Sequence, residues 1–254
     1  MNIIPLPAFQ DNYIWLLRHD RAAVVVDPGD AEVVRDYLAE QKLQLTAILI
    51  THHHADHIGG IAALTAEYDI PVYGPSKTKI AGVNNAVSEG DRIMLPELDL
   101  TLDTLDVPGH TATHIAFYGS GLLFPGDTLF SAGCGRLLGG TAAQLYHSLN
   151  RLAALPDDTK VYCSHEYTLS NLAFAGQVEP SNAEQIQWHE HCLQLRADDL
   201  PTLPSTIGRE KAINPFLRTG ETAVIDAVTV RDGRAPSDGL ICFTALRAWK
   251  DVFK

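Results

Sequence analysis

The stretch "LITHHHADHIGG" (residues 49–60) contains four of the eleven histidines of this 254-residue chain. They stand beside one aspartate, in the order His52, His53, His54, Asp56 and His57. The apolar run "LTAILI" before them predicts a buried strand that ends at the cluster. Alternate residues of an extended loop point the same way, so His52 and His54 can bind one ion from one side, whereas His53 points away. The pattern HxHxDH at a strand end therefore predicts a metal site.

Three further candidate ligands also follow predicted strands. His110 ends "LDVPGH", Asp127 ends "LLFPGD" and His165 ends "VYCSH". Because neighbouring strand ends gather at one edge of a layered α/β fold, these side chains could converge with the histidine cluster. We expect them to hold two divalent ions about 3.5–4 Å apart, which would lower the pKa of a shared water.

The candidate ligands divide between the two predicted ions. One ion would be bound by His52, His54 and His110, and the other by Asp56, His57 and His165. The Asp127 carboxylate could bridge both ions. Asp56 and Asp127 are the expected catalytic carboxylates. Mixed nitrogen and oxygen ligation suits several metals. Zinc is the first expectation, with iron or manganese as alternatives.

Other polar residues near these motifs have weaker assignments. His114 in "GHTATH" is expected to hold a neighbouring loop by hydrogen bonds rather than to bind metal. Asp27 fits a turn former and a partner of a metal ligand equally well. The remaining histidines have no motif around them and are expected at the surface: His19, His147, His189 and His191.

The two parts of the chain differ in pattern. Residues 1–170 contain short apolar strands that end in polar, Gly-rich loops, with helical patterns between some of them. One such helix has Thr141 as its expected N-cap. Residues 171–254 are mainly helical in pattern, with a Pro-rich loop. We therefore expect an α+β protein, with a catalytic domain over 1–170 and a helical domain over 171–254.

The composition restricts the function classes. The 31 acidic and 19 basic residues give a net charge of −12, which argues against nucleic-acid and anionic-membrane partners. No apolar run approaches the ~20 residues that span a bilayer, and the N-terminus does not resemble a signal peptide. The four cysteines are far apart and form no CxxC pair. We expect a cytoplasmic monomer with reduced thiols.

The motifs HxHxDH, "PGHT", "GDTLF" and "SHEYT", in this order, resemble the metallo-β-lactamase superfamily. The resemblance implies an αββα sandwich, in which two packed sheets lie between helices and a two-metal site lies at one edge. Within the superfamily, "FQDNYIWLL", "GDTLFSAGCGR", "HEYTLSN" and "LRAWKDVF" are similar to the glyoxalase II (hydroxyacylglutathione hydrolase) family over almost the whole chain. This resemblance implies the same division of metal ligands.

The resemblance also implies an activity. Members of the family hydrolyse the thioester S-D-lactoylglutathione to glutathione and D-lactate, the second step of methylglyoxal detoxification. A hydroxide that bridges the metals would attack the thioester carbon. The departing thiolate has a pKa near ~8.5, so no separate acid is needed.

Four residues match family positions that contact glutathione: Arg136, Tyr167, Arg247 and Lys250. The helical domain over 171–254 is therefore expected to bind substrate. Arg247 and Lys250 would lie about one helical turn apart and could face the glutathione carboxylates. The chain departs from the family at Leu138 and Gly139, where an aromatic and an acidic residue are usual. This departure bears on the affinity for glutathione rather than on the chemistry.

Three alternatives share the same scaffold. A persulfide dioxygenase would use one iron, but "GRLLGG" and the long helical C-terminal region favour the hydrolase. A β-lactamase or a nuclease is a second alternative, and a nuclease usually needs more positive charge. A non-catalytic binding module is the third, and the complete ligand set argues against it.

Overall fold

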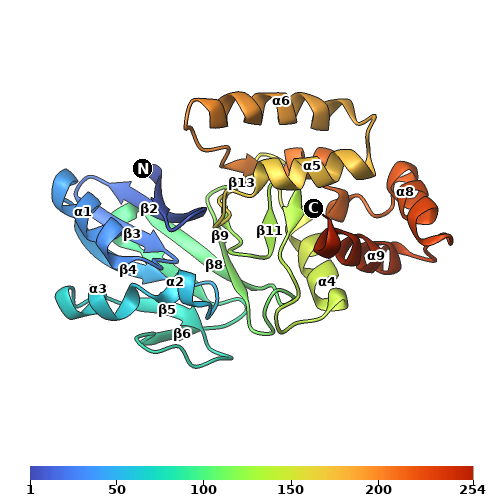
Figure 1. Ribbon diagram of the computed structural model, residues 1–254. Coiled ribbons are helices and arrows are strands. Elements are labelled where there is room, and N and C mark those ends of the chain that lie inside the picture. Colours follow the sequence, from blue (N-terminus) through green and yellow to red (C-terminus); the bar gives the residue numbers. More distant parts are fainter. Residues whose placement is uncertain (254) are drawn as a thin grey trace. The chain divides into compact units, whose positions relative to one another are not determined.

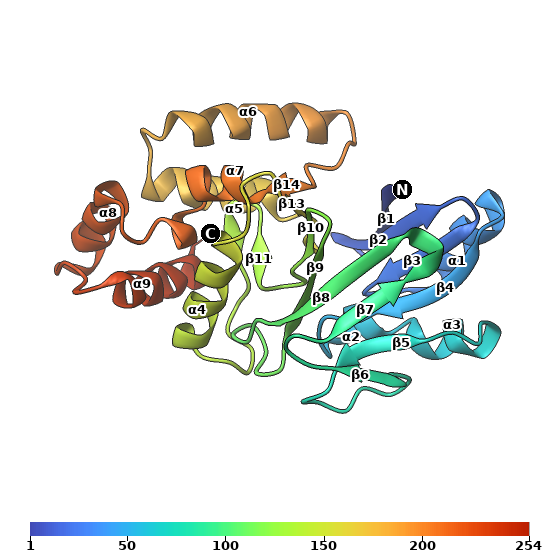
Figure 2. The ribbon, with the colours of Figure 1, turned by 180° about the vertical axis from the view of Figure 1, so that it is seen from behind.

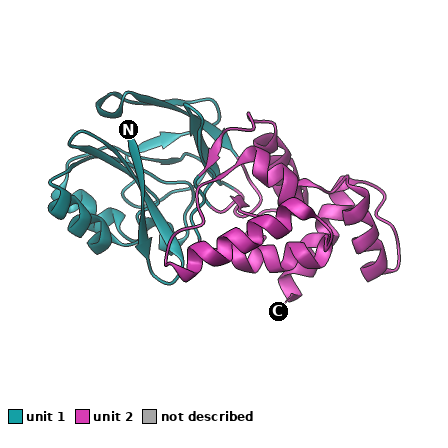
Figure 3. Cartoon of the chain, turned by 90° about the horizontal axis from the view of Figure 1, so that it is seen from above, with its two compact units in different colours: residues 1–106, 113–126, 162–165 teal, residues 107–112, 127–161, 166–254 magenta. Residues whose placement is uncertain are grey.

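The computed structural model describes residues 1–253, which form two compact units (Figure 3). Unit 1 consists of residues 1–106, 113–126 and 162–165. Unit 2 consists of residues 107–112, 127–161 and those from 166 on. The chain thus passes between the units several times. The expected domains, 1–170 and 171–254, remain a prediction.

Within the described residues, unit 1 contains a six-stranded sheet in the order β1-β2-β3-β4-β5-β6 (Figure 1). Its strands are β1 (Asn2–Ala8), β2 (Asn12–His19), β3 (Ala22–Val26), β4 (Gln44–Leu49), β5 (Val72–Pro75) and β6 (Asn85–Val87). Strands β1 to β3 pair antiparallel, and β3 to β6 pair parallel. The predicted strand before the histidine cluster is therefore confirmed as β4, in the interior of this sheet.

Helices connect the parallel strands of this sheet. They are α1 (Ala31–Gln41), α2 (Ala55–Ile58) and α3 (Ile61–Glu67). Helix α1 begins at Asp30, whose side chain accepts a hydrogen bond from the backbone N–H of Glu32. Val34 and Leu38, one turn apart on α1, pack with Leu16 of β2 in one buried cluster. This packing holds α1 against the sheet whose strand β4 leads into the histidine cluster.

A second set of antiparallel strands belongs to unit 1 and has the order β10-β9-β8-β7 (Figure 2). The strands are β7 (Arg92–Leu95), β8 (Leu100–Asp106), β9 (Ile115–Gly119) and β10 (Leu122–Phe124). Strands β9 and β10 form an antiparallel hairpin. The 3₁₀ helix η1 (Pro96–Leu98), before β8, contacts β2 and β3 of the first sheet. Side chains from both sets of strands thus form the buried interior of unit 1.

Unit 2 is mainly helical. Its helices are α4 (Ala142–Ala153), α5 (Thr168–Val178), α6 (Ala183–Ala197), α7 (Ile207–Ile213), η2 (Pro215–Leu217), α8 (Thr222–Asp232) and α9 (Gly239–Val252). Its strands are β11 (Leu129–Phe130), β12 (Gly133–Cys134), β13 (Lys160–Val161) and β14 (Ser205–Thr206). Thr141 is confirmed as the N-cap of α4, in a capping box with Gln144. The helical pattern predicted after residue 171 is likewise confirmed.

The interior of unit 2 is apolar and partly aromatic. Phe174 of α5 stacks on Phe216 of η2 with ring centroids 5.9 Å apart, and Phe216 meets Phe243 of α9 edge to face at 5.7 Å. The four cysteines of the chain are buried free thiols, as expected. Within residues 1–253, no helix has both the length and the apolar character that crossing a membrane requires. The predicted α+β class is confirmed.

Candidate metal centre

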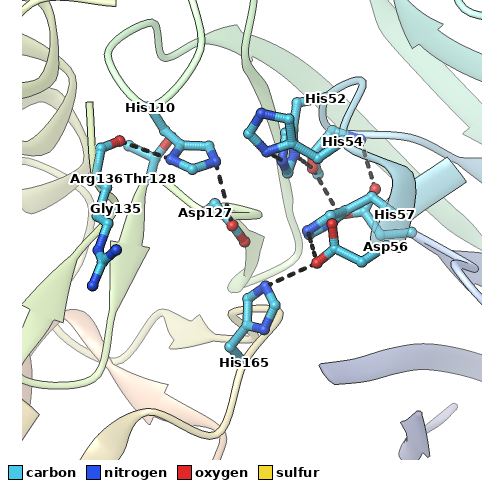
Figure 4. Close-up of polar contacts among 12 residues, drawn as sticks. His52, His54, Asp56, His57, His110, Asp127, Thr128, Gly135, Arg136 and His165 are labelled. Atoms are coloured by element: carbon cyan, nitrogen blue, oxygen red, sulfur yellow. Dashed lines mark hydrogen bonds and ion pairs between the residues drawn. The ribbon is translucent and has the colours of Figure 1, made fainter. Parts of the chain in front are cut away.

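In unit 1, Asp56 lies between two imidazoles (Figure 4). Its Oδ2 atom is 3.4 Å from Nε2 of His57 and 3.5 Å from Nε2 of His165. Ligand atoms around a tetrahedral zinc with bonds of about 2.0–2.1 Å lie roughly 3.3–3.4 Å apart. The three ligand atoms therefore have the separations of a metal-binding set, although His165 is far from the other two in sequence.

The Asp56 carboxyl is held in its ionised form. The hydrogen bond with His57 is the main cause that keeps the pKa of Asp56 well below its usual range, against the opposing effect of burial. Asn12 adds a hydrogen bond from its Nδ2 to Asp56 Oδ2, at 3.0 Å. A carboxylate that is ionised at neutral pH can bind a metal without first losing a proton.

His52 and His54 form a second part of the unit 1 site. Nε2 of His52 and Nδ1 of His54 are 3.0 Å apart, and the His52 side chain is buried. His53 between them is exposed, in keeping with the predicted alternation. His114 stacks on His52, with ring centroids 4.5 Å apart. Of the three consecutive histidines, His52 and His54 thus lie side by side, and His53 is exposed.

Three buried histidines of unit 1, His52, His57 and His165, have an oxygen partner at Nδ1. Nδ1 of His57 is 3.0 Å from Asp27, and Nδ1 of His165 is 2.8 Å from Asp11. Nδ1 of His52 is 3.0 Å from the Thr51 hydroxyl. Such partners fix the tautomer, which leaves Nε2 as the lone-pair donor available to a metal.

Asp27 serves in both of the roles left open by the sequence. Its carboxylate accepts hydrogen bonds from the backbone N–H and the hydroxyl of Thr51 as well as contacting His57. Its backbone has a φ of 52°, in the left-handed region that aspartate tolerates in turns. One residue therefore shapes the turn after β3 and orients His57, a candidate ligand on α2.

Sequence reasoning missed the role of Asp11. It lies in the β1–β2 turn, within the quoted stretch "FQDNY", where nothing marked it as a partner of a histidine 154 residues away. The start of β2, just after this turn, is joined to the His165 loop by a hydrogen bond from the backbone N–H of Tyr13 to the Ser164 carbonyl, at 2.7 Å. The motif stretch that carried the family resemblance thus includes a residue that orients a candidate ligand.

In unit 2, His110 lies beside Asp127 (Figure 4). His110 Nε2 is 3.4 Å from Asp127 Oδ2, and His110 Nδ1 donates to the Arg136 carbonyl at 2.8 Å. The hydroxyl of Ser148, on α4, donates to the Pro108 carbonyl at 2.7 Å and so holds the loop that carries His110. The distance between the two ligand atoms of this pair is similar to the distances in unit 1, and the His110 ring is likewise held through its Nδ1 atom.

Unit 2 also contains the four residues expected to contact substrate. Arg136 is exposed, and Tyr167 is partly buried with its ring 5.2 Å from that of Phe130. Lys250 is partly buried and donates from Nζ to the Ser170 carbonyl at 3.0 Å. Arg247 is 3% exposed and pairs with Asp251. The four side chains thus differ in their solvent exposure.

Burial lowers the pKa of Lys250 to about 8, with further lowering by the charges of Arg247 and Arg136. Three cations are therefore near one another in a chain of strongly negative net charge. Such a cluster is a local positive field suited to an anionic ligand.

Comparisons with known proteins agree with this geometry. The family model described as "Metallo-beta-lactamase superfamily" matches residues 9–165, and that described as "Hydroxyacylglutathione hydrolase C-terminus" matches residues 166–253. A hydroxyacylglutathione hydrolase of Nitrosomonas europaea is 49% identical over 254 residues, which cover 100% of this chain and 97% of that protein.

Two solved structures are similar to the chain. ETHE1 from Myxococcus xanthus has a TM-score of 0.67 and 29% identity, with 98% of this chain and 100% of that one covered. TTHA1623, solved in a di-iron-bound form, has a TM-score of 0.60 and 26% identity, with 85% of this chain and 100% of that one covered.

The fold, the buried His and Asp groups and the match over residues 9–165 place the chain in the metallo-β-lactamase superfamily. The fold is thus the α+β fold of that superfamily with a helical C-terminal region, and its ligand groups indicate binding of divalent metal. Within the superfamily, the full-length identity shows that the chain belongs to the hydroxyacylglutathione hydrolase family.

Proposed function

We propose that this chain is a metal-dependent thioester hydrolase that converts S-D-lactoylglutathione and water to glutathione and D-lactate. The observation that carries the proposal is the full-length identity of 49% with a hydroxyacylglutathione hydrolase. The family model for the C-terminus of these hydrolases also matches residues 166–253, the part of the chain in which substrate contacts are expected.

We further propose that seven side chains hold two ions, with zinc as the first expectation and iron or manganese as alternatives. The proposed ligands are His52, His54, Asp56, His57, His110, Asp127 and His165. Support comes from the tetrahedral separations within each unit and from the di-iron form of TTHA1623. Asp127, as a two-oxygen carboxylate, is the proposed bridge.

The proposed chemistry divides between the metals and the chain. When bound, the ions supply Lewis acidity toward the thioester carbonyl and lower the pKa of water to about 7. Asp56 and Asp127 supply negative charge that holds the ions in place, and the oriented imidazoles keep Nε2 directed inward. The glutathione thiolate leaves without protonation, because its pKa is near ~8.5. The chain therefore needs no separate acid.

The proposed substrate contacts are Arg136, Tyr167, Arg247 and Lys250. The three cations offer positive charge to the two carboxylates of glutathione. The partly buried Tyr167 can add a hydroxyl contact. Arg247 is 3% exposed and pairs with Asp251, so its proposed contribution is mainly its charge. The predicted cytoplasmic location, the monomeric state and the absence of nucleic-acid and membrane partners stay predictions.

The test is a hydrolysis assay with S-D-lactoylglutathione before and after chelation, with elemental analysis of the same sample. We expect turnover that is lost on chelation and restored by zinc, and about two equivalents of metal per chain. Turnover that survives complete metal removal would overturn the proposal. Oxygen consumption with a persulfide substrate and one iron per chain would instead identify the dioxygenase alternative.

A further inference from the structure

Strands β11 and β12 form a hairpin whose two ends meet the unit 2 part of the candidate centre. The hairpin begins just after Asp127, and the backbone N–H of Gly135 at its other end donates to the Thr128 carbonyl at 3.3 Å. Gly135 packs closely on both candidate ligands, since a Cβ atom there would lie 2.0 Å from the Asp127 carbonyl oxygen and 3.1 Å from His110 Nδ1. The next carbonyl, that of Arg136, accepts from His110 Nδ1 at 2.8 Å (Figure 4). A shift of the hairpin would therefore move the Asp127 backbone and turn the His110 ring.

The turn of this hairpin has a backbone conformation that its own residues do not favour. Phe130 pairs with Gly133, so the turn consists of Ser131 and Ala132. Short hairpin turns favour Gly, Asn or Asp where φ is positive. Ala132 instead has a φ of 55°, in the left-handed region. This region costs residues other than glycine about 1–2 kcal/mol. The turn therefore depends on contacts from elsewhere in unit 2.

Two side chains at helix α7 supply such contacts, and they reach backbone atoms of the turn. The N–H of Ala132 donates to Glu210 Oε2 at 2.7 Å. Asn214, which follows α7, has its Nδ2 atom 2.9 Å from the Gly133 carbonyl oxygen and 3.2 Å from that of Phe130. The same Nδ2 atom also donates to Glu210 Oε2 at 3.1 Å. The path of the hairpin is thus set by residues about 80 positions further along the chain.

Glu210 is fully buried, and its hydrogen-bond partners within residues 1–253 are neutral. They are the Ala132 N–H, the Asn214 amide and the Ser205 hydroxyl, which donates to Oε1. Burial raises the pKa of Glu210, and the hydrogen bonds from Ser205 and Ala132 act in the opposite direction. Burying an acidic group costs free energy that its hydrogen bonds must offset. Glu210 and the turn therefore depend on each other.

We propose that Glu210 is a positioning residue for the metal centre: from helix α7 it holds the turn of the β11–β12 hairpin, and the hairpin in turn fixes the Asp127 backbone and the carbonyl that orients His110. The inference rests on the proposed function for its kinetic readout, but not for its metal-binding readout. It gives the helical part of unit 2 a role in metal binding beside its expected role in substrate binding.

The principal test compares Glu210→Ala with Glu210→Gln. Glu210→Ala loses the acceptor for the Ala132 N–H. We expect zinc retained against a competing chelator to fall about tenfold, the lower end of the range for residues that orient metal ligands. Glu210→Gln keeps an oxygen acceptor for that N–H, so its zinc retention should stay within about twofold of the unsubstituted chain. We expect kcat for lactoylglutathione to follow zinc retention in both variants. Normal zinc retention by Glu210→Ala, or an equal loss in both variants, would overturn the inference.

The matched control is Glu179→Ala. Glu179 is also a buried glutamate of unit 2, 3% exposed, and it accepts two hydrogen bonds from Arg218, at 2.8 and 3.0 Å. These contacts lie outside the hairpin. We expect this variant to lower the melting temperature without changing zinc retention. A loss of zinc equal to that of Glu210→Ala would show a general effect of destabilisation and would contradict the inference.

A milder variant covers the case in which Glu210→Ala does not fold. Asn171, on α5, donates from Nδ2 to the Ser131 carbonyl in the same turn, at 3.0 Å. Asn171→Ala should therefore show the same pattern with a smaller loss of zinc. A lowered melting temperature with unchanged zinc retention in this variant would contradict the inference. If the unsubstituted chain failed to hydrolyse lactoylglutathione, the proposed function would fail, whereas zinc retention would still decide the role of Glu210.

Discussion

Three histidines of the candidate centre are oriented through the ring nitrogen opposite the one that faces other ligand atoms. Asp27 and Asp11 orient His57 and His165 in unit 1, and the Arg136 carbonyl orients His110 in unit 2. Carboxylate partners also raise the basicity of the ligating nitrogen. The residues that determine metal affinity therefore extend beyond those that would touch the metal.

The contact between Asp11 and His165 gives a prediction at this scale. Asp11→Ala removes the acceptor of His165 Nδ1, so the ring can change tautomer and rotate. We expect metal affinity to fall about 10–100-fold, measured by chelator competition with elemental analysis. The control is Asp20→Ala, because Asp20 also faces a histidine, His19 at 3.9 Å, but at an exposed site. Equal zinc retention by both variants would contradict the assigned role of Asp11.

Lys250 gives a prediction of pH dependence. Its pKa is lowered to about 8, so it is charged below that pH and neutral above it. If the charged form binds a glutathione carboxylate, kcat/KM should fall as pH rises through about 8, approaching tenfold per pH unit. The measurement is a pH profile corrected for spontaneous thioester hydrolysis. Lys250→Arg should remove this limb of the profile, and an unchanged limb in that variant would assign it to another group.

The metal-ligand candidates could be chosen from the sequence because dense His and Asp motifs at strand ends are rare by chance. The orienting residues could not, because a single aspartate in a turn has many uses. The partner of Asp11 lies 154 residues along the chain, and no local spacing encodes such a contact. The burial of Arg247 was equally hidden, since its helical spacing with Lys250 fits an exposed face as well as a buried one.

Among the elements, helix α4 and the loop that carries His110 depend on each other. Gly109, just before the ligand, has a φ of 145°, and a Cβ atom there would lie 2.4 Å from the Cα atom of Leu145 on α4. Backbone–backbone proximity of this kind cannot be relieved by a side-chain rotation. The glycine of the "PGH" motif is therefore required by the approach of the helix.

Gly109→Ala should displace the loop and destabilise the protein. We expect a loss of about 2–5 kcal/mol in the free energy of unfolding, from backbone strain and overpacking together, and a loss of bound zinc. Gly121→Ala is the control, because Gly121 has a φ of 74° but a Cβ atom there meets nothing within 4 Å. It should lose only about 1–2 kcal/mol. Similar unfolding curves for the two variants would contradict this account of the loop.

The longer elements could be predicted because periodicity and capping act locally. Thr141 and the spacing of α4 are an example. The two-residue strands β11, β12 and β14 could not be predicted, since two residues show no period and their pairing depends on other segments. Strand β14, within the region expected to be helical, pairs with β13, which lies more than 40 residues earlier.

At the scale of the whole molecule, the proposed metal ligands come from several separate segments of the chain. His110 and Asp127 belong to unit 2, and the other proposed ligands belong to unit 1. The fold class could be predicted from the sequence, because the order of strands, helices and motifs is recorded there. The division into units could not, since the chain returns to unit 1 twice after residue 106.

The most direct measurement is the turnover of S-D-lactoylglutathione by Asp127→Ala, in a sample whose melting curve shows that it is folded. Asp127 is the proposed bridge between the ions, so its loss should abolish thioester hydrolysis and lower the bound metal below two equivalents. Near-normal turnover by the folded variant would contradict the central claim that this carboxylate joins the two metal sites.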